Sequence, residues 1–133
     1  MDFPFELLKR YNSLDHSKIR IGRDNDGGYV ILDGLNYDLM ISCGINNDDS
    51  FEHDFLNHHK GVSCLAYDGT VNDIPNFHDR IQFVKKNISN ENSDFLTNLH
   101  DVVGSNNNIF LKMDIEGSEY PWLHCMPKKY LRK

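Results

Sequence analysis

Two acidic side chains follow an apolar segment late in the chain, where an acid gains little from packing. Residues 109–113 have the sequence IFLKM and lead directly into Asp114 and Glu116. Gly117 then interrupts the extended pattern, and Ser118 can cap a following helix. In open α/β sheets the ligand crevice lies just beyond the carboxyl ends of the strands. We therefore predict that Asp114 and Glu116 are catalytic residues placed for acid–base chemistry.

Two earlier apolar segments end in a similar way. Residues 37–45 contain Ser42-Cys43-Gly44 near their end, and residues 61–70 end in Asp68-Gly69-Thr70. A glycine after the first strand lets a ligand approach the backbone, and the following helix offers free N–H groups. An acid about 20 residues further on can accept hydrogen bonds from ribose hydroxyls. Asp68 lies 24 residues after Gly44, so the spacing predicts a site for a nucleoside-containing cofactor.

The loop after residues 37–45 distinguishes between such cofactors. It reads SCGINNDDSFE, with Gly44 as its single glycine, and lacks the G-x-G-x-x-G pattern of dinucleotide sites. Asp48 and Asp49 would place negative charge where a dinucleotide has its pyrophosphate. S-adenosylmethionine has no phosphate, and its sulfonium and amino groups are compatible with nearby acids. The loop therefore favours S-adenosylmethionine over NAD, and a nicotinamide-dependent oxidoreductase is the weaker alternative.

Strands and helices alternate along the chain in an order that would bring these acids to one edge of a sheet. Residues 18–32 predict a β-hairpin with Asp26-Gly27-Gly28 at its turn. The other predicted elements are an amphipathic helix at 3–11, strands at 37–45, 61–70, 80–88 and 109–113, and helices from about Ser50 to Gly61, at 92–103 and from Ser118. Such alternation indicates a Rossmann-like α/β fold, with a mostly parallel sheet and flanking helices.

The composition narrows the classes of protein and partner. The 133 residues fit one domain, 1–133, with the N-terminal helix and hairpin in 1–36 and the Rossmann-like core in 37–133. The net charge of −6 argues against free nucleic acid as a partner. Three cysteines without C-x-x-C spacing argue against a disulfide framework and a zinc site. No signal peptide or membrane span is apparent, so we expect a cytoplasmic protein without a membrane partner.

Five segments together resemble one enzyme family. RIGRDNDGGYVI, ISCGINNDDSFEHDF, AYDGT, FVKKNIS and IFLKMDIEGSEYPWL are similar to S-adenosylmethionine-dependent class I methyltransferases of the FkbM-like group. LKMDIEGSE resembles that group's K-[IM]-D-[IV]-E-G-[AS]-E signature, and the resemblance spans residues 19–124. It implies methyl transfer from S-adenosylmethionine, usually to an oxygen, on a small-molecule or carbohydrate acceptor.

The resemblance also implies roles for the loops after the first two core strands. By position, Ser42, Gly44 and Asn46 would line the methionine end of the cofactor. Asp68, followed by Gly69, would bind the ribose. A structural alternative is that Asp68 only caps a turn with Gly69.

For the acids near the C-terminus, the resemblance implies that Asp114 lies beneath the transferring methyl group. Related enzymes use an acid there for a divalent metal ion or for the acceptor hydroxyl. Glu116 and Glu119 would face the acceptor or fix the loop. The structural alternatives are that Asp114 is a turn residue and that Glu116 pairs with Lys112 or with a backbone N–H.

The sequence departs from the family in its number of strands. Methyltransferases of this class have seven strands and continue well beyond the motif, whereas this sequence ends at Lys133. Two interpretations follow. The chain is either a methyltransferase or a shortened descendant of one, or it is a non-catalytic binding or assembly module that keeps the fold. In both cases the 109–113 strand would leave an open sheet edge, through which a homodimer could form.

Overall fold

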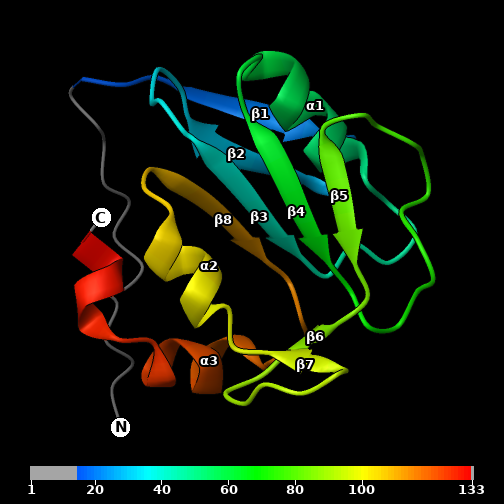
Figure 1. Cartoon of the computed structure of the whole chain (residues 1–133). Helices are drawn as coiled ribbons and strands as arrows, with labels where there is room; N and C mark the ends of the chain where they lie inside the picture. The colour runs from blue at the N-terminus through cyan, green and yellow to red at the C-terminus, as the bar shows by residue number, and fades with distance from the viewer. Residues whose placement is uncertain (1–14, 133) are drawn as a thin grey trace, which may run out of the picture.

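The centre of the molecule is a four-stranded parallel sheet in the order β5-β4-β3-β8. The computed structural model describes residues 15–132. The sheet strands are β3 (Leu39–Cys43), β4 (Ser63–Tyr67), β5 (Ile81–Val84) and β8 (Ile109–Met113). All four strands run in the same direction, so their carboxyl ends meet at one edge (Figure 1). The predicted α/β class is therefore confirmed, and the sheet is consistent with a Rossmann-like fold.

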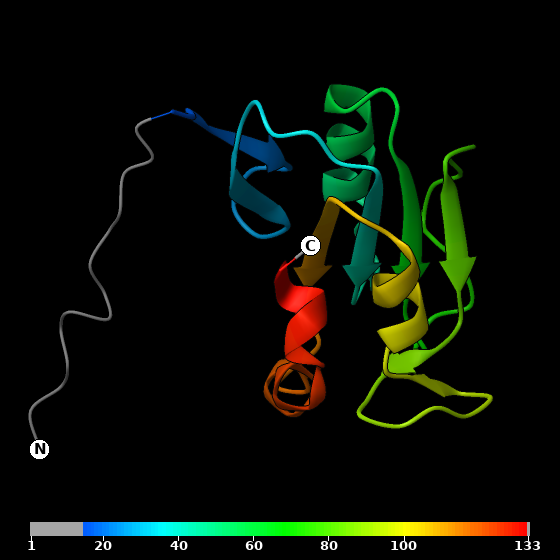
Figure 2. The same ribbon diagram turned by 60° about the vertical axis from the view of Figure 1, so that its left-hand side comes forward.

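One face of the sheet is covered by a β-hairpin and a helix. The hairpin consists of β1 (Lys18–Gly22) and β2 (Gly28–Leu32), paired antiparallel as predicted, and the helix is α1 (Ser50–His58). The hairpin packs beside α1 (Figure 2). Phe51 and Phe55 of α1 are buried against Phe110 of β8, with ring centroids 6.0 and 4.5 Å away. Each such side chain stabilises the fold by about 1.5–3 kcal/mol through burial.

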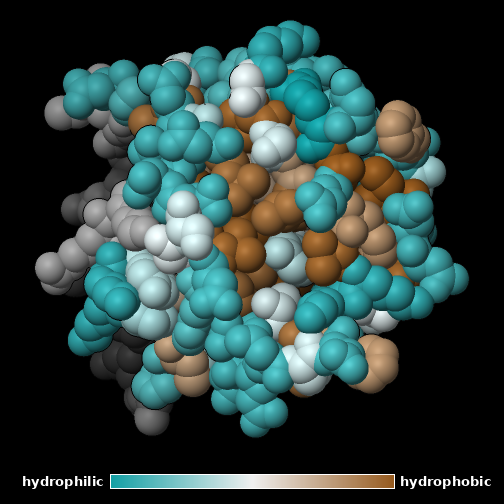
Figure 3. Space-filling model, viewed as in Figure 1, coloured by the Kyte–Doolittle hydropathy of each residue, from teal (hydrophilic) through white to brown (hydrophobic). Residues whose placement is uncertain are grey.

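The opposite face is covered less completely. It packs against α2 (His100–Ser105) and α3 (Glu119–Cys125), which is followed by the 3₁₀ helix η2 (Lys128–Arg132). Trp122 of α3 is buried in this core and donates its indole N–H to the carbonyl of Asn98. Leu65 of β4 and Val84 of β5 are only partly buried, and apolar side chains are visible over this part of the sheet (Figure 3).

The helix predicted over 92–103 is wrong over residues 92–99, because α2 begins only at His100. Residues 96–97 form a short strand, β7 (Leu96–Thr97), which pairs with β6 (Asn87–Ile88), and Phe95 is 77% exposed. The reason is local: the side chains of Ser93 and Asn98 accept hydrogen bonds from nearby backbone N–H groups and so compete with helical bonds. Leu99 then has a left-handed backbone, with φ of 61°, and α2 begins after it.

The remaining expectations about the fold have mixed outcomes. The strand predicted at 80–88 is split into β5 and β6, while the helix predicted at 3–11 lies outside the described residues. Within residues 15–132, β8 pairs only with β3, so it is an edge strand as predicted; a dimer through this edge stays a prediction. No helix in the described part of the chain has the length and apolar character needed to cross a membrane.

Candidate functional site

A pocket of about 460 Å³ opens at the carboxyl edge of the sheet. Its lining comes from the hairpin turn, the loop after β3, the segments around the ends of β4 and β6, and the residues that follow β8. Sites for small molecules and cofactors typically have volumes of about 300–1,000 Å³. The pocket thus has the size and the place in the fold that a cofactor requires.

Most of the predicted site residues line this pocket. They are Gly44, Asn46, Asp68, Asp114 and Glu116. Ser42 and Gly69 lie outside the lining. Ser42 is fully buried and donates its hydroxyl to Glu52 Oε1 at 2.5 Å, while the N–H of Gly69 donates to the side-chain oxygen of Asn87 at 3.0 Å. These two residues therefore lie outside the pocket lining, and their contact with a cofactor stays a prediction.

Gly44 lies where three strand ends converge. Its N–H donates to the carbonyl of Tyr67 at the end of β4, and its φ of 81° is in the left-handed region. A Cβ at this position would collide with the carbonyl oxygen of Asp114, just past β8. Glycine is therefore required here for the close approach of β3 and β8.

The carboxylate of Asp68 is fully engaged by the protein itself. Its Oδ2 accepts the backbone N–H groups of Ile45 (3.1 Å) and Asn46 (2.9 Å) in the loop after β3. Its Oδ1 accepts the N–H (2.8 Å) and the hydroxyl (2.6 Å) of Thr70. A carboxylate has about four acceptor positions. The turn interpretation thus describes part of what Asp68 does, and ribose binding stays a prediction in which a hydroxyl would share or replace one of these bonds.

These contacts give a prediction for acid stability. Burial alone would raise the pKa of Asp68, but the hydrogen bonds from Thr70, Asn46 and Ile45 outweigh it and hold the pKa below its ordinary value of 3.8. The stabilisation by the ionised carboxylate is therefore complete above that value and is lost as the pH falls through the folded-state pKa. The free energy of unfolding of the wild type should exceed that of Asp68→Asn at neutral pH, and the difference should shrink as the pH falls below 3.8. A difference independent of pH would contradict this account.

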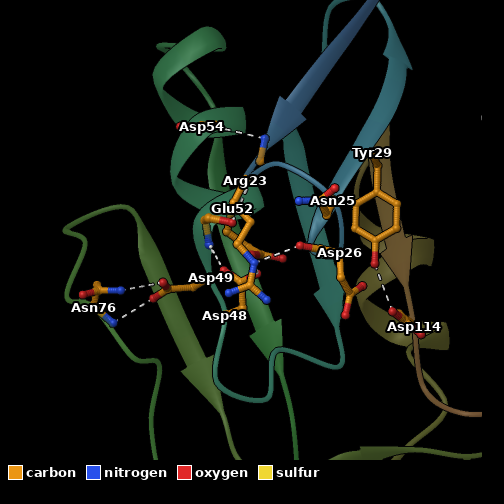
Figure 4. Close-up of polar contacts among 12 residues, drawn as sticks. Arg23, Asn25, Asp26, Tyr29, Asp48, Asp49, Glu52, Asp54, Asn76 and Asp114 are labelled. Carbon is orange, nitrogen blue, oxygen red and sulfur yellow. Dashed lines mark hydrogen bonds and ion pairs between the residues drawn. The ribbon is translucent and has the colours of Figure 1, made fainter.

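Tyr29 is a site residue that the sequence analysis missed. Its hydroxyl donates to Asp114 Oδ2 at 2.9 Å, although the two residues are 85 positions apart (Figure 4). Burial and then the hydrogen bond to Asp114 raise the pKa of Tyr29 to about 12, so the hydroxyl keeps its proton at neutral pH. Tyr29 thus fixes the orientation of the Asp114 carboxylate, which is otherwise exposed at the pocket. The alternation of side chains in the predicted hairpin was the one available signal that Tyr29 faces inward.

A buried ion pair lies beneath the pocket. Glu52 of α1 is fully buried, and its Oε1 accepts hydrogen bonds from Lys112 Nζ at 2.8 Å and from Ser42. The Lys112 side chain is only 11% exposed and lines the pocket. The alternative in which Glu116 pairs with Lys112 is therefore wrong, because the ammonium of Lys112 pairs with Glu52 instead.

The hairpin turn is attached by polar contacts to α1 and to Asp48 in the loop before it (Figure 4). Arg23 Nε lies 3.0 Å from Asp48 Oδ2, and the N–H of Arg23 donates to the hydroxyl of Ser50. The N–H of Gly22 donates to Asp54 Oδ2 at 3.1 Å. These bonds hold the hairpin as one wall of the pocket.

The loop after β8 is fixed by Glu119. Its two carboxylate oxygens accept the N–H groups of Ile115 and Gly117, each at 2.7 Å. The intervening Glu116 has a left-handed backbone with φ of 59° and an exposed side chain. Of the two predicted roles for Glu119, the structure shows the second, which is to fix the loop.

Comparison of the chain with protein-family models, curated proteins and solved structures gave no match. The class of ligand is therefore inferred from the pocket residues themselves.

The pocket carries more negative than positive charge. Five carboxylates line it, against three cationic side chains, and two of these cations are already paired, Arg23 with Asp48 and Lys112 with Glu52. Within residues 15–132, no group of three or more His, Cys, Asp or Glu is arranged to hold a metal ion. A divalent metal ion at Asp114 stays a prediction.

Proposed function

We propose that this chain is an S-adenosylmethionine-dependent methyltransferase of the FkbM-like class I group, acting on an oxygen of a small molecule or carbohydrate. Two observations together carry the proposal. An acid-rich pocket lies at the carboxyl edge of a parallel sheet, and backbone N–H groups of the loop after β3 already donate hydrogen bonds to carboxylates of the protein. The fold, the pocket volume and the positions of the strand-end residues support it.

The loop after β3 argues against a phosphate-containing cofactor. A pyrophosphate at such a loop would be bound by free backbone N–H groups at the start of the next helix. Here the N–H groups of Ile45 and Asn46 donate to Asp68, and the N–H of Ser50 donates to Asp48. These carboxylates would also repel a phosphate. A positively charged nucleoside cofactor without phosphate does not need free N–H groups in this loop and is not repelled by its carboxylates.

For methyl transfer, the protein has to align the acceptor with the cofactor and to remove one proton from the acceptor hydroxyl. Bound S-adenosylmethionine supplies a methyl group on a positively charged sulfur. With this cofactor bound, the Asp114 carboxylate would be the group that accepts the proton of the acceptor hydroxyl. Tyr29 holds this carboxylate in place through its hydrogen bond, and Glu116 is presented on the same side by the loop that Glu119 fixes.

The proposal predicts a specific order of affinities in a calorimetric titration. S-adenosylmethionine and S-adenosylhomocysteine should bind, and NAD should not. The variant Asp114→Asn/Glu116→Gln should lower the affinity for S-adenosylmethionine by about fivefold, because the two removed charges would face a cationic sulfur. The effect is no larger because exposed charge pairs contribute at most about 1 kcal/mol. The affinity for S-adenosylhomocysteine, whose sulfur is neutral, should fall less.

The matched control is Asp101→Asn, which removes an exposed acid on α2 outside the pocket lining and should change neither affinity. A folded wild-type chain that binds NAD as tightly as S-adenosylmethionine, or that binds none of the three, would refute the proposal.

A second function is favoured by a separate observation. β8 has an unpaired edge within the described residues, and the face over β4 and β5 is incompletely covered. Both features suit a non-catalytic assembly module that buries them against another chain. Sedimentation of the purified chain together with the titration distinguishes the two functions: a stable oligomer without cofactor binding favours the assembly module.

A further inference from the structure

The ammonium group of Lys112, the second-last residue of β8, has an unusual environment. On its buried side it contacts Glu52 Oε1 at 2.8 Å. The rings of Tyr29 and Phe51 lie beside it, each with its centroid 5.8 Å from Nζ. Lys112 is also one of the residues that line the pocket. The charge is thus held at the wall of the pocket by an acid and two aromatic rings.

Lys112 keeps hydrogen-bonding capacity on its pocket side. An ammonium has three N–H donors, and within residues 15–132 Glu52 is the one hydrogen-bond acceptor that Lys112 contacts. Its side chain is only 11% exposed, so water satisfies these donors poorly. A ligand acceptor placed at this wall would gain a charge-assisted hydrogen bond in a partly desolvated setting.

The other two cations of the pocket are less suited to this role. The Arg23 side chain is 57% exposed, and its Nε contacts both Asp48 and the carbonyl of Asp26. Lys86 donates its ammonium to the carbonyl of Ser93 in the β6–β7 connection. Lys112 is therefore the pocket cation that is held by a fully buried acid and has no second hydrogen-bond acceptor within residues 15–132.

We propose that Lys112 binds the carboxylate of the cofactor's methionine moiety; this inference rests on the proposed function. S-adenosylmethionine carries one anionic group, that carboxylate, and in a pocket dominated by acids it needs a cation of its own. Lys112 supplies this cation on the hairpin side, next to Tyr29 and Asp114, where the methyl group would be transferred. The lysine thus selects ligands that carry the amino-acid group.

The test compares two ligands that differ in this group. S-adenosylhomocysteine has the carboxylate, and 5′-methylthioadenosine is the corresponding thioether without the amino-acid part. Lys112→Met alone would leave Glu52 buried without its partner and could prevent folding. The informative variant is therefore Lys112→Met/Glu52→Gln, which removes both charges, with its fold checked by circular dichroism.

The wild type should bind S-adenosylhomocysteine about tenfold to a hundredfold more tightly than 5′-methylthioadenosine, as expected for a hydrogen bond to a charged group. In Lys112→Met/Glu52→Gln this ratio should fall to near unity, with the affinity for 5′-methylthioadenosine unchanged. Glu52→Gln alone, which keeps the lysine, and Lys86→Met, which removes the other pocket lysine, should both preserve the wild-type ratio.

A ratio that persists in the double variant, or an equal loss of affinity for both ligands, would overturn the role of Lys112 while leaving the proposed function standing. A wild type that binds neither ligand would overturn the proposed function and this inference with it.

Discussion

Gly44→Ala is expected to destabilise the chain by at least about 3 kcal/mol, or to prevent folding altogether. Two costs combine at this position. The backbone φ of 81° is unfavourable for alanine, and its Cβ would collide with the backbone carbonyl of Asp114. Since backbone atoms cannot rotate away as a flexible side chain can, β3 and β8 would have to separate at the pocket. Urea-induced unfolding measures the loss, and a titration with S-adenosylmethionine should show that binding is lost too.

Two other glycines separate these costs. Gly117 also has a positive φ, 99°, but a Cβ there would meet no atom within 4 Å, so Gly117→Ala should cost about 1–2 kcal/mol from the backbone alone. Gly61 has neither a positive φ nor a close neighbour, so Gly61→Ala should be nearly neutral. Equal losses for Gly44→Ala and Gly117→Ala would show that the approach of β8 to Gly44 is not as close as described.

Asp68→Ala should have the second largest effect, a loss of about 3 kcal/mol in the free energy of unfolding. The substitution leaves the N–H groups of Ile45 and Asn46 without their acceptor, and Ile45 is almost fully buried. Each unsatisfied buried donor costs about 1–3 kcal/mol. The loop that forms one wall of the pocket should therefore loosen, and cofactor binding should fall together with stability.

The exposed neighbour Asp73 provides the control for this prediction. Its carboxylate accepts only a local bond from the N–H of Ile74, and Asp73→Ala should change stability by less than about 0.5 kcal/mol. Hydrogen exchange adds a second readout, because the amides of residues 45 and 46 should lose protection in Asp68→Ala. A variant that loses S-adenosylmethionine binding with unchanged stability and unchanged exchange would instead show that Asp68 contacts the ligand directly.

The sequence predicted the sheet and the place of the site because both depend on local patterns. Apolar runs bounded by turn residues located β3, β4 and β8 closely, and parallel strands place Gly44, Asp68 and Asp114 at one edge. The helix predicted over 92–103 failed before His100, because apolar periodicity does not reveal side chains such as Ser93 that bind the backbone and break the helix.

The contacts that define the site's chemistry could not be predicted in the same way. Tyr29 meets Asp114 across 85 positions and Glu52 meets Lys112 across 60, and each contact depends on which face of the sheet the hairpin and α1 cover. Spacing along the chain carries no information on that choice. Asp68 was found by its spacing, but its role towards the backbone of the neighbouring loop depends on distances that only the folded chain has.

The strand order has a consequence for the time at which the pocket can form. β3 pairs on one side with β4, the next strand of the sheet along the chain, and on the other with β8, which is synthesised much later. During synthesis, a nascent chain that has already paired β3 with β4 still lacks Asp114 and the wall that closes around Gly44. Pairings between distant segments also form slowly, because the intervening loop must first be closed. We expect pulsed hydrogen exchange to show that the amides of β8 become protected last, in the same step in which the pocket becomes able to bind its ligand.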